Sequence, residues 1–331
     1  MNIQLQNKLE LLVENSQSIR SDFIWHDAMA KRLVALAYAL EGKKVDVEAI
    51  KACHRMIKDE VGMFSTFRGN MAVYVAASLS LSEKPQQLLS DTLEVYDLLK
   101  QEGFWASDYL VVSAYEIAAN AKNHNFGYIT QRSMEFYREM KANIRFYIGQ
   151  DDYIFAAMLA LSDIDIHDGA LKMRHLFRQL KKEFSAFTSG NSLVTLSQML
   201  VLGESTAECV QNLLKLNKVL RKKKVRLDKT YTLPSLGVLG MFAVDKYAFA
   251  DDLIEARDYL RSQKGFGAFS VSTQELLLYA VSLITNAYMG DAGNNVVKAG
   301  VATSITNLII AQQVAMIVAI STATTAAAAS C

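Results

Sequence analysis

The sequence predicts an all-α protein, built of six or seven helical hairpins of about 40 residues each. Three observations support this fold class. Only 2 prolines occur among 331 residues, and proline normally marks loops and strand edges. A polar start followed by a long apolar run recurs along the chain. No segment alternates apolar and polar residues for long enough to indicate a sheet, so helices joined by short turns are expected throughout.

The repeat is visible in the residues that open successive apolar runs. These residues stand 39, 44, 38, 43 and 40 positions apart. They are Asn70, Tyr109, Tyr153, Asn191, Pro234 and Gln274. An earlier copy begins near His26 and Asp27, with "LVALAYAL" as its apolar run. A nearly constant period of this size indicates a stack of similar helical units.

Each repeat contains two kinds of helix. The first is apolar nearly all round and rich in small residues, as in "MAVYVAASLSLS" and "YIFAAMLALS". A helix that is apolar on every side is expected to be buried on every side. The second is amphipathic, as in "TLEVYDLLKQEG" and "DDLIEARDYLRSQKG", and so predicts an outer, solvated layer. The N-terminus opens with such a helix, carrying Leu5, Leu9, Leu12 and Val13 on one stripe.

The ends of the helices carry their own signals. Pro85 and Pro234 suit the first turns of an outer and an inner helix. Gly103 and Gly265 follow basic last turns, where a C-terminal glycine cap is expected. Aromatic turns separate the repeats, and we expect their rings to fill the seams between neighbouring hairpins. These turns read "MFSTF", "GFW", "IRFYIG", "EFSAF" and "GFGAF".

Two architectures fit an inner layer of buried helices and an outer amphipathic layer. One is an open α-solenoid, and the other is a closed α/α toroid with its inner helices around a cavity. Residues 1–290 are predicted to form a single repeat domain. Residues 291–331 form an apolar tail, uncharged from Val301 to Ser330. We expect a helix packed against the repeats, in the same chain or in a second copy, with a frayed end.

The tail also allows a membrane alternative. Residues 301–320 are long enough to cross a bilayer. Their threonine, serine, asparagine and glutamine side chains and the single flanking Lys298 count against an anchor. Membrane contact through 301–320 is therefore the lesser hypothesis.

Charge and cysteine usage exclude several function classes. Lys and Arg number 35 against 34 Asp and Glu, a net charge of +1, which gives no reason to expect nucleic acid as a partner. The run "RKKKVR" at 221–226 reads as a solvated helix end. The 3 cysteines are far apart in sequence, as expected for reduced thiols in a cytoplasmic protein. The N-terminus lacks the features of a signal peptide.

A candidate site lies at the starts of the inner helices, which would share one rim. Carboxylates that converge there could bind a divalent cation or act as an acid and base pair. Capping of each helix is the competing interpretation, because Asp, Asn, Ser and Thr are the favoured N-cap residues. The candidate rim residues are His26, Asp27, Arg68, Asn70, Asp108, Tyr109, Asp151, Asp152, Tyr153, Asn191, Thr273, Gln274 and Glu275.

Other chemistry finds little support. Asp108, Asp151 and Asp152 are the candidate metal ligands, and no other cofactor is indicated. The sequence contains no GxSxG, GxGxxG or HExxH motif. His26 is the one histidine that this alignment places on the rim, and packing or solvation explains it better than metal binding.

Several blocks together resemble a bacterial family, found mainly in Firmicutes, that is catalogued as a domain of unknown function. The resemblance covers essentially the whole chain, including the Ala/Ser-rich end. It implies a bacterial, cytoplasmic protein and supplies no catalytic residues. The blocks are "FRGNMAVYVAASLSLS", "YDLLKQEGFWASDYL", "GQDDYIFAAMLALSD", "GNSLVTLSQMLVLG", "LPSLGVLG" and "RSQKGFGAFSV".

Two functions follow as hypotheses. The first is a non-catalytic binding or protein-interaction module, with a protein partner or self-association. The second is an enzyme, or a binder of a metal or small ligand, with its site at the rim of a toroid cavity. The repeat pattern and the lack of a nucleophile, metal or nucleotide motif favour the first.

Overall fold

The computed structural model describes residues 2–24, 26–63, 65–240 and 245–291. These residues form fourteen α-helices and three short 3-10 helices, and no strand occurs among them, which confirms the all-α prediction. The α-helices are α1 (Ile3–Ser18), α2 (Ala28–Leu40), α3 (Val47–Glu60), α4 (Ala72–Ser80), α5 (Pro85–Gln101), α6 (Asp108–Asn120), α7 (Phe126–Asn143), α8 (Tyr153–Leu161), α9 (Ile166–Glu183), α10 (Gly190–Leu202), α11 (Ala207–Lys222), α12 (Ser235–Gly240), α13 (Lys246–Ser262) and α14 (Thr273–Asp291). The 3-10 helices are η1 (Thr66–Arg68), η2 (Lys122–His124) and η3 (Gln150–Asp152).

Contacts group the chain into two compact units. Unit 1 comprises residues 2–17, residues 39–44 and the described chain from Leu171 onward. Unit 2 comprises residues 18–38 and 45–170. Both units are built of the two kinds of helix that the sequence predicts. The prediction of a single repeat domain over residues 1–290 stays a prediction.

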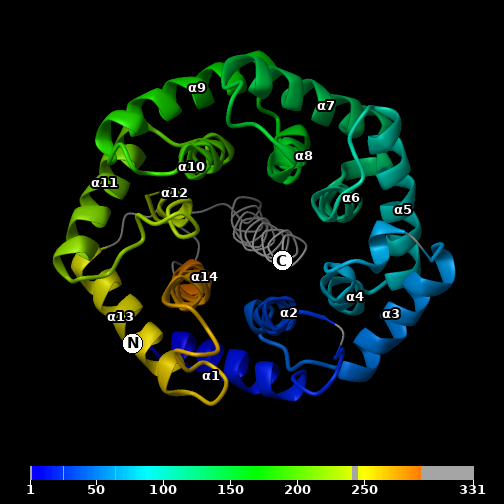
Figure 1. Ribbon diagram of the computed structural model, residues 1–331, viewed down its shortest axis with the longest axis horizontal. Coiled ribbons are helices and arrows are strands. Elements are labelled where there is room, and N and C mark those ends of the chain that lie inside the picture. Colours follow the sequence, from blue (N-terminus) through cyan, green and yellow to red (C-terminus); the bar gives the residue numbers. More distant parts are fainter. Residues whose placement is uncertain (1, 25, 64, 241–244, 292–331) are drawn as a thin grey trace, which may run out of the picture. The chain divides into compact units, whose positions relative to one another are not determined.

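Unit 2 has two layers of helices. The buried helices α4, α6 and α8 run side by side and are seen end-on in Figure 1, with the amphipathic helices α3, α5 and α7 along one side of them. In α8 every residue from Tyr153 to Ala160 is buried. In α5 only one face is buried, including Leu89, Val95 and Leu99. The difference follows from composition, because an all-apolar helix gains from burial on every side and an amphipathic helix on one.

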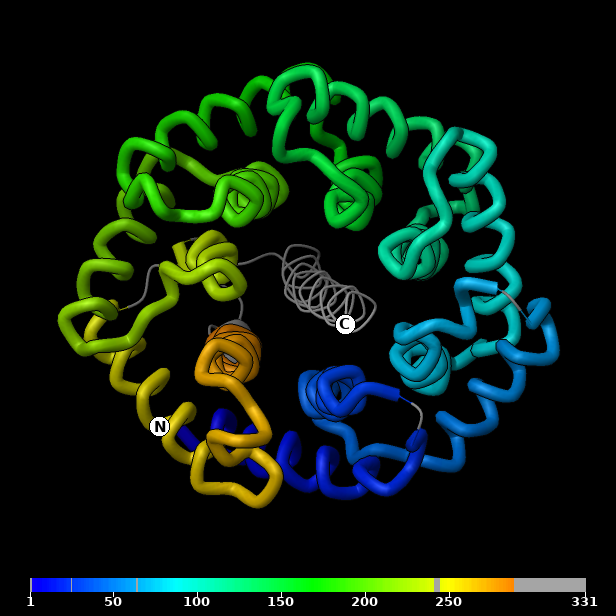
Figure 2. Tube along the Cα trace, in the orientation of Figure 1, coloured from blue at the N-terminus to red at the C-terminus, as the bar shows by residue number. Residues whose placement is uncertain are grey.

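Unit 1 repeats this arrangement. Helices α10, α12 and α14 pack one after another, and α11 and α13 cover them, as the green to orange segments of Figure 2 show. Helix α1 belongs to the same unit and buries the predicted stripe of leucines. The carboxylate of Glu10 in α1 raises the pKa of Tyr259 in α13, although burial of Tyr259 contributes more. The first helix therefore lies with the last helices in one unit, while the choice between solenoid and toroid stays a prediction.

The predicted helix ends are largely confirmed. Pro85 is the first residue of α5, and Pro234 lies in the turn directly before α12. Gly103 has a φ of +105°, its N–H donates to the Lys100 carbonyl, and the Phe104 N–H donates to the Leu99 carbonyl. This pair of bonds is the Schellman motif, which closes the C-terminus of α5.

The tail prediction lies almost wholly outside the described residues, as does the membrane alternative at 301–320. Within the described part of the chain, no helix combines the length and the hydropathy needed to cross a membrane.

Candidate functional site

The candidate rim residues divide between the two units. Unit 2 contains His26, Asp27, Arg68, Asn70, Asp108, Tyr109, Asp151, Asp152 and Tyr153. Unit 1 contains Asn191, Thr273, Gln274 and Glu275. All of them lie at or just before the start of a buried helix, as their sequence positions predict.

Several of these polar groups bond to the backbone at helix ends. Asp27 Oδ1 accepts a hydrogen bond from the Met29 N–H at 2.6 Å, before the first turn of α2. Asp152 Oδ2 accepts one from the Gly149 N–H at 2.8 Å, before α8. These bonds satisfy N–H groups that a helix start leaves without an intrahelical partner.

Arg68 binds the C-terminal end of helix α3. Its Nη2 donates to the Lys58 carbonyl at 2.5 Å and to the Val61 carbonyl at 3.1 Å. These carbonyls lie at the C-terminal end of α3, where the helix dipole favours a cation. The Arg68 guanidinium therefore has a structural task at this helix end.

His26 is brought next to a second histidine. It forms a hydrogen bond with the Asn70 backbone, and its ring centroid lies 5.4 Å from that of His54 in α3. Burial lowers the pKa of both rings, and Lys58 lowers both further, so that the pKa of His54 is about 4. Both imidazoles are therefore neutral at pH 7. Sequence reasoning missed His54, because the contact depends on how α3 packs against the loop before α2.

Asp108 has the most unusual environment of the predicted set. One carboxylate oxygen, Oδ1, is buried without a hydrogen-bond partner, although the carboxylate accepts a bond from the Met71 backbone N–H. Burial raises the pKa of Asp108 to about 6. The carboxylate lies so close to Gly69 that a Cβ atom there would stand 2.7 Å from Oδ1. A glycine is thus required at position 69 for this approach.

A cluster of tyrosines and acids lies at the start of α8. The ring of Tyr153 is 5.1 Å from that of Tyr137 and 4.8 Å from that of Phe104, measured between centroids. Burial, and next the neighbouring Tyr153, raise the pKa of Tyr137 to about 12. Burial also raises the pKa of Asp151. Because η3 packs against α6, its two acids lie beside the helix that Asp108 begins.

The candidates of unit 1 are held locally. The Tyr279 hydroxyl donates to Glu275 Oε1 at 2.5 Å, and both side chains are buried in α14. Gln274 Oε1 accepts a hydrogen bond from the Tyr231 N–H at 3.5 Å, and Asn191 is exposed. Among the residues that the structure describes, no three His, Cys, Asp or Glu side chains group as metal ligands would.

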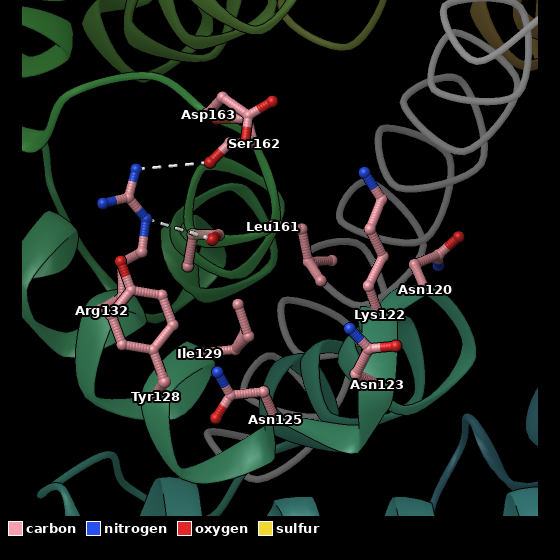
Figure 3. Close-up of a pocket in the computed structure, with 11 residues that line it drawn as sticks. Asn120, Lys122, Asn123, Asn125, Tyr128, Ile129, Arg132, Leu161, Ser162 and Asp163 are labelled. Atoms are coloured by element: carbon pink, nitrogen blue, oxygen red, sulfur yellow. Dashed lines mark hydrogen bonds between the residues drawn. The ribbon is translucent and has the colours of Figure 1, made fainter.

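A polar cleft of about 410 Å³ lies at the other end of the unit 2 layer (Figure 3). It opens between the C-terminal ends of α6 and α8 and the start of α7. Arg132 lines it and donates to the carbonyls of Ala160 at 3.2 Å and Ser162 at 3.3 Å, and also to that of Ile164. The cleft is rich in amide and hydroxyl groups suited to a small polar ligand. The other lining residues are Asn120, Lys122, Asn123, Asn125, Tyr128, Ile129, Leu161 and Asp163.

The aromatic turns do not all fill seams as predicted. At least one apolar side chain of each turn is buried, and we call these residues the anchors. Another points into water, and we call these residues the tips. The anchors include Phe67, Phe104, Phe184 and Phe266. The exposed tips are Met63, Trp105, Phe146, Phe187 and Phe269, together with Ile24 before α2. The prediction was wrong for the tips, because a turn of three to six residues has room to bury only part of its apolar side chains.

The sequence matches the family described as protein of unknown function DUF4003 over residues 15–314. The chain belongs to the DUF4003 family. No curated protein and no solved structure matches it.

The tips of this DUF4003 chain follow the period of the repeat. Ile24, Met63, Trp105, Phe146 and Phe187 stand 39, 42, 41 and 41 residues apart. Phe269 follows after 82 residues, and the intermediate position is the acidic Asp228. Among the described residues, each hairpin but one thus presents an exposed apolar side chain in the loop before its buried helix. The period of the apolar runs could have revealed this pattern, but it does not tell an anchor from a tip.

Proposed function

We propose that this protein is a non-catalytic binding module that meets its partner through the tips. The observation that carries the proposal is the recurrence of an exposed, large apolar side chain in the loop before the buried helix of successive hairpins. Trp105 is 74% exposed and Phe146 is 90% exposed. A single exposed apolar residue is ordinary on a protein surface, but a repeated set at one end of the buried helices is not.

The anchors support this role. Beneath Trp105, the ring of Phe104 is buried and packs edge-on against Tyr153. Ile144 and Ile148 are buried on either side of Phe146. The buried neighbours fix the backbone at each tip, so the loop loses little conformational freedom on binding, which lowers the entropic cost of association. Several weak contacts on one array also reinforce one another through their high effective concentration.

Bacterial origin and a cytoplasmic location belong to the same proposal. They are supported by the family resemblance and by the spacing of the cysteines, which suits reduced thiols.

Covalent footprinting tests the proposal without knowledge of the partner. Hydroxyl-radical labelling of Trp105 and Phe146 is measured in the purified protein and in cells that produce it. We expect both side chains to be labelled less in cells, because the partner covers them there. Tyr128, an exposed ring at the polar cleft, is the matched control and should be labelled equally in both. Equal labelling of Trp105 and Phe146 in both settings would contradict the proposal.

A second candidate function rests on Asp108. A buried carboxylate oxygen without a partner, on a group with a pKa of about 6, is a feature of sites that bind a cation or transfer a proton. In this alternative the start of α6 holds a divalent cation or a small ligand. Calorimetric titration with Mg²⁺ would then give a saturable heat that Asp108→Asn abolishes. A titration without heat would remove the divalent cation as a candidate.

A further inference from the structure

We infer that the tips of unit 2 dock the protein onto the interface of a zwitterionic phospholipid bilayer. The inference rests on the proposed function, because it names the partner that the tips meet. Its starting point is the geometry of Ile24, Met63, Trp105 and Phe146, four exposed side chains on four loops of one compact unit.

The four tips lie at one end of the layer of buried helices. Each tip precedes a buried helix: α2, α4, α6 or α8. Helices α4, α6 and α8 run side by side in Figure 1, and an amphipathic helix returns the chain between them, so that they run in the same direction. Their starts, and the loops before them, therefore face the same way. The polar cleft of Figure 3 occupies the opposite end.

The isolation of each tip favours a lipid interface over a folded protein partner. Phe146 is 90% exposed, so it has almost no contact with its own chain. Packed helices stand about 8–10 Å apart, so rings on successive loops leave polar surface between them. The energetically important residues of protein interfaces lie in packed patches that exclude water. A bilayer interface needs no matching pockets and accepts Trp and Phe side chains at any lateral spacing.

The charges around the tips indicate which lipids are suited. The five residues on either side of each tip contain six basic residues, Arg20, Lys58, Arg68, Lys100, Lys141 and Arg145. The same windows contain seven acidic residues, Asp22, Asp27, Asp59, Glu60, Glu102, Asp108 and Asp151. Every tip of unit 2 thus has at least one basic and at least one acidic residue in its window. A balanced surface gains little from an anionic membrane and pairs with headgroups that carry both charges.

Unit 1 carries the same feature independently. Phe187 and Phe269 are exposed tips above the buried anchors Phe184 and Phe266. Their flanking charges are few, with Lys182 and Glu183 beside the first and Lys264 beside the second. The docking surface is thus a property of the repeat and is present in both units.

Vesicle flotation with the full-length protein tests the inference. The probes are phosphatidylcholine vesicles and vesicles that also contain phosphatidylglycerol. We expect the protein to float with both, with little dependence on salt. Trp105→Ala and Phe146→Ala should each lower the partition coefficient about tenfold or more, since each removes a large apolar side chain from the interface. The double variant should remain at the bottom of the gradient.

Two controls separate binding from folding. Tyr128→Ala removes an exposed aromatic ring at the opposite end and should float like the parent. Trp105→Phe keeps an aromatic tip and should also retain binding. Because the tips contact so little of their own chain, the variants should keep the parent's circular dichroism and melting temperature.

The outcomes also separate this inference from the proposed function. Failure of the parent protein to float, equal flotation of the double variant, or binding that needs anionic lipid and vanishes in salt would each overturn the lipid inference. If the parent protein forms a dimer and the double variant does not, the tips bind a second copy of the chain. The proposed function would then stand, and the lipid inference would fall. Absence of tip protection in the footprinting experiment would remove both.

Discussion

Glu116 provides a sharp test of how the buried layer of unit 2 is built. Its side chain is 4% exposed in the middle of the packed helices, and burial raises the pKa of the carboxyl group from 4.5 to about 8. Its hydrogen-bond donor is the Asn120 amide, at 3.3 Å from Oε2, and Tyr74 of α4 is close enough to be affected by its charge. The folded protein therefore holds Glu116 protonated at neutral pH, and unfolding lets it ionise.

The pH dependence of stability follows from this shift. A carboxyl group whose pKa is raised on folding stabilises the folded state fully below pH 4.5, and this stability is lost as the pH rises through 8. A tenfold difference in proton affinity is worth about 1.4 kcal/mol, so the free energy of unfolding should fall by about 3 kcal/mol between pH 5 and pH 8. Glu116→Gln keeps the shape and the hydrogen bond but cannot ionise.

The measurement compares urea unfolding of the parent and of Glu116→Gln, followed by circular dichroism, at several pH values between 5 and 8. The difference in stability between the two proteins should change with pH in favour of the glutamine variant by the amount given above. Other titrating groups are common to both proteins and cancel. Parallel pH profiles would refute the reasoning, because Glu116 would then ionise freely in the folded protein.

Three further variants test local features of the fold by the same unfolding assay. Gly103→Ala should lower the free energy of unfolding by about 1–2 kcal/mol, because its φ of +105° suits glycine and strains any other residue. Gly62→Ala should be nearly neutral, because a Cβ atom there meets no atom within 4 Å. Equal effects of the two substitutions would contradict the glycine cap of α5. Arg132→Lys should lower the free energy of unfolding by about 2 kcal/mol, because the guanidinium reaches the three carbonyls from two separate nitrogens, whereas lysine has a single nitrogen. An unchanged unfolding midpoint would refute this. Ser107→Ala should lower the free energy of unfolding by about 1 kcal/mol, and Ser107→Gly by only a few tenths, as for other N-cap residues. A larger loss for the glycine variant than for the alanine variant would contradict the role of Ser107 as the N-cap of α6.

The fold was predictable because its signals are local. The number of prolines, the alternation of all-apolar and amphipathic runs, and the glycine after a basic turn each depend on a few neighbouring residues. Pro85 and Gly103 therefore stand where the sequence places them. The grouping of α1 with the last helices depends on packing between distant segments, and no local pattern contains that information.

The candidate site was predictable in position but not in chemistry. The rim residues lie at the starts of buried helices, yet the sequence treats Asp108 and Asp152 alike. The structure distinguishes them, because Asp152 caps a turn while one oxygen of Asp108 is buried without a partner. The proximity of His54 to His26 and the burial of Glu116 also arise from tertiary packing. The same holds for the tips, since an aromatic residue in a turn can face either the core or the solvent.

Fluorescence of Trp105 tests the central claim about the tips most directly. The chain has 2 tryptophans, so Trp25→Phe leaves Trp105 as the single emitter. In the free protein, Trp105 should emit at long wavelength and be readily quenched by acrylamide, as expected of an exposed indole. On addition of phosphatidylcholine vesicles, the emission should shift to shorter wavelength and the quenching should fall. An indole that is already shielded in the free protein, or one that the vesicles leave unchanged, would contradict the account.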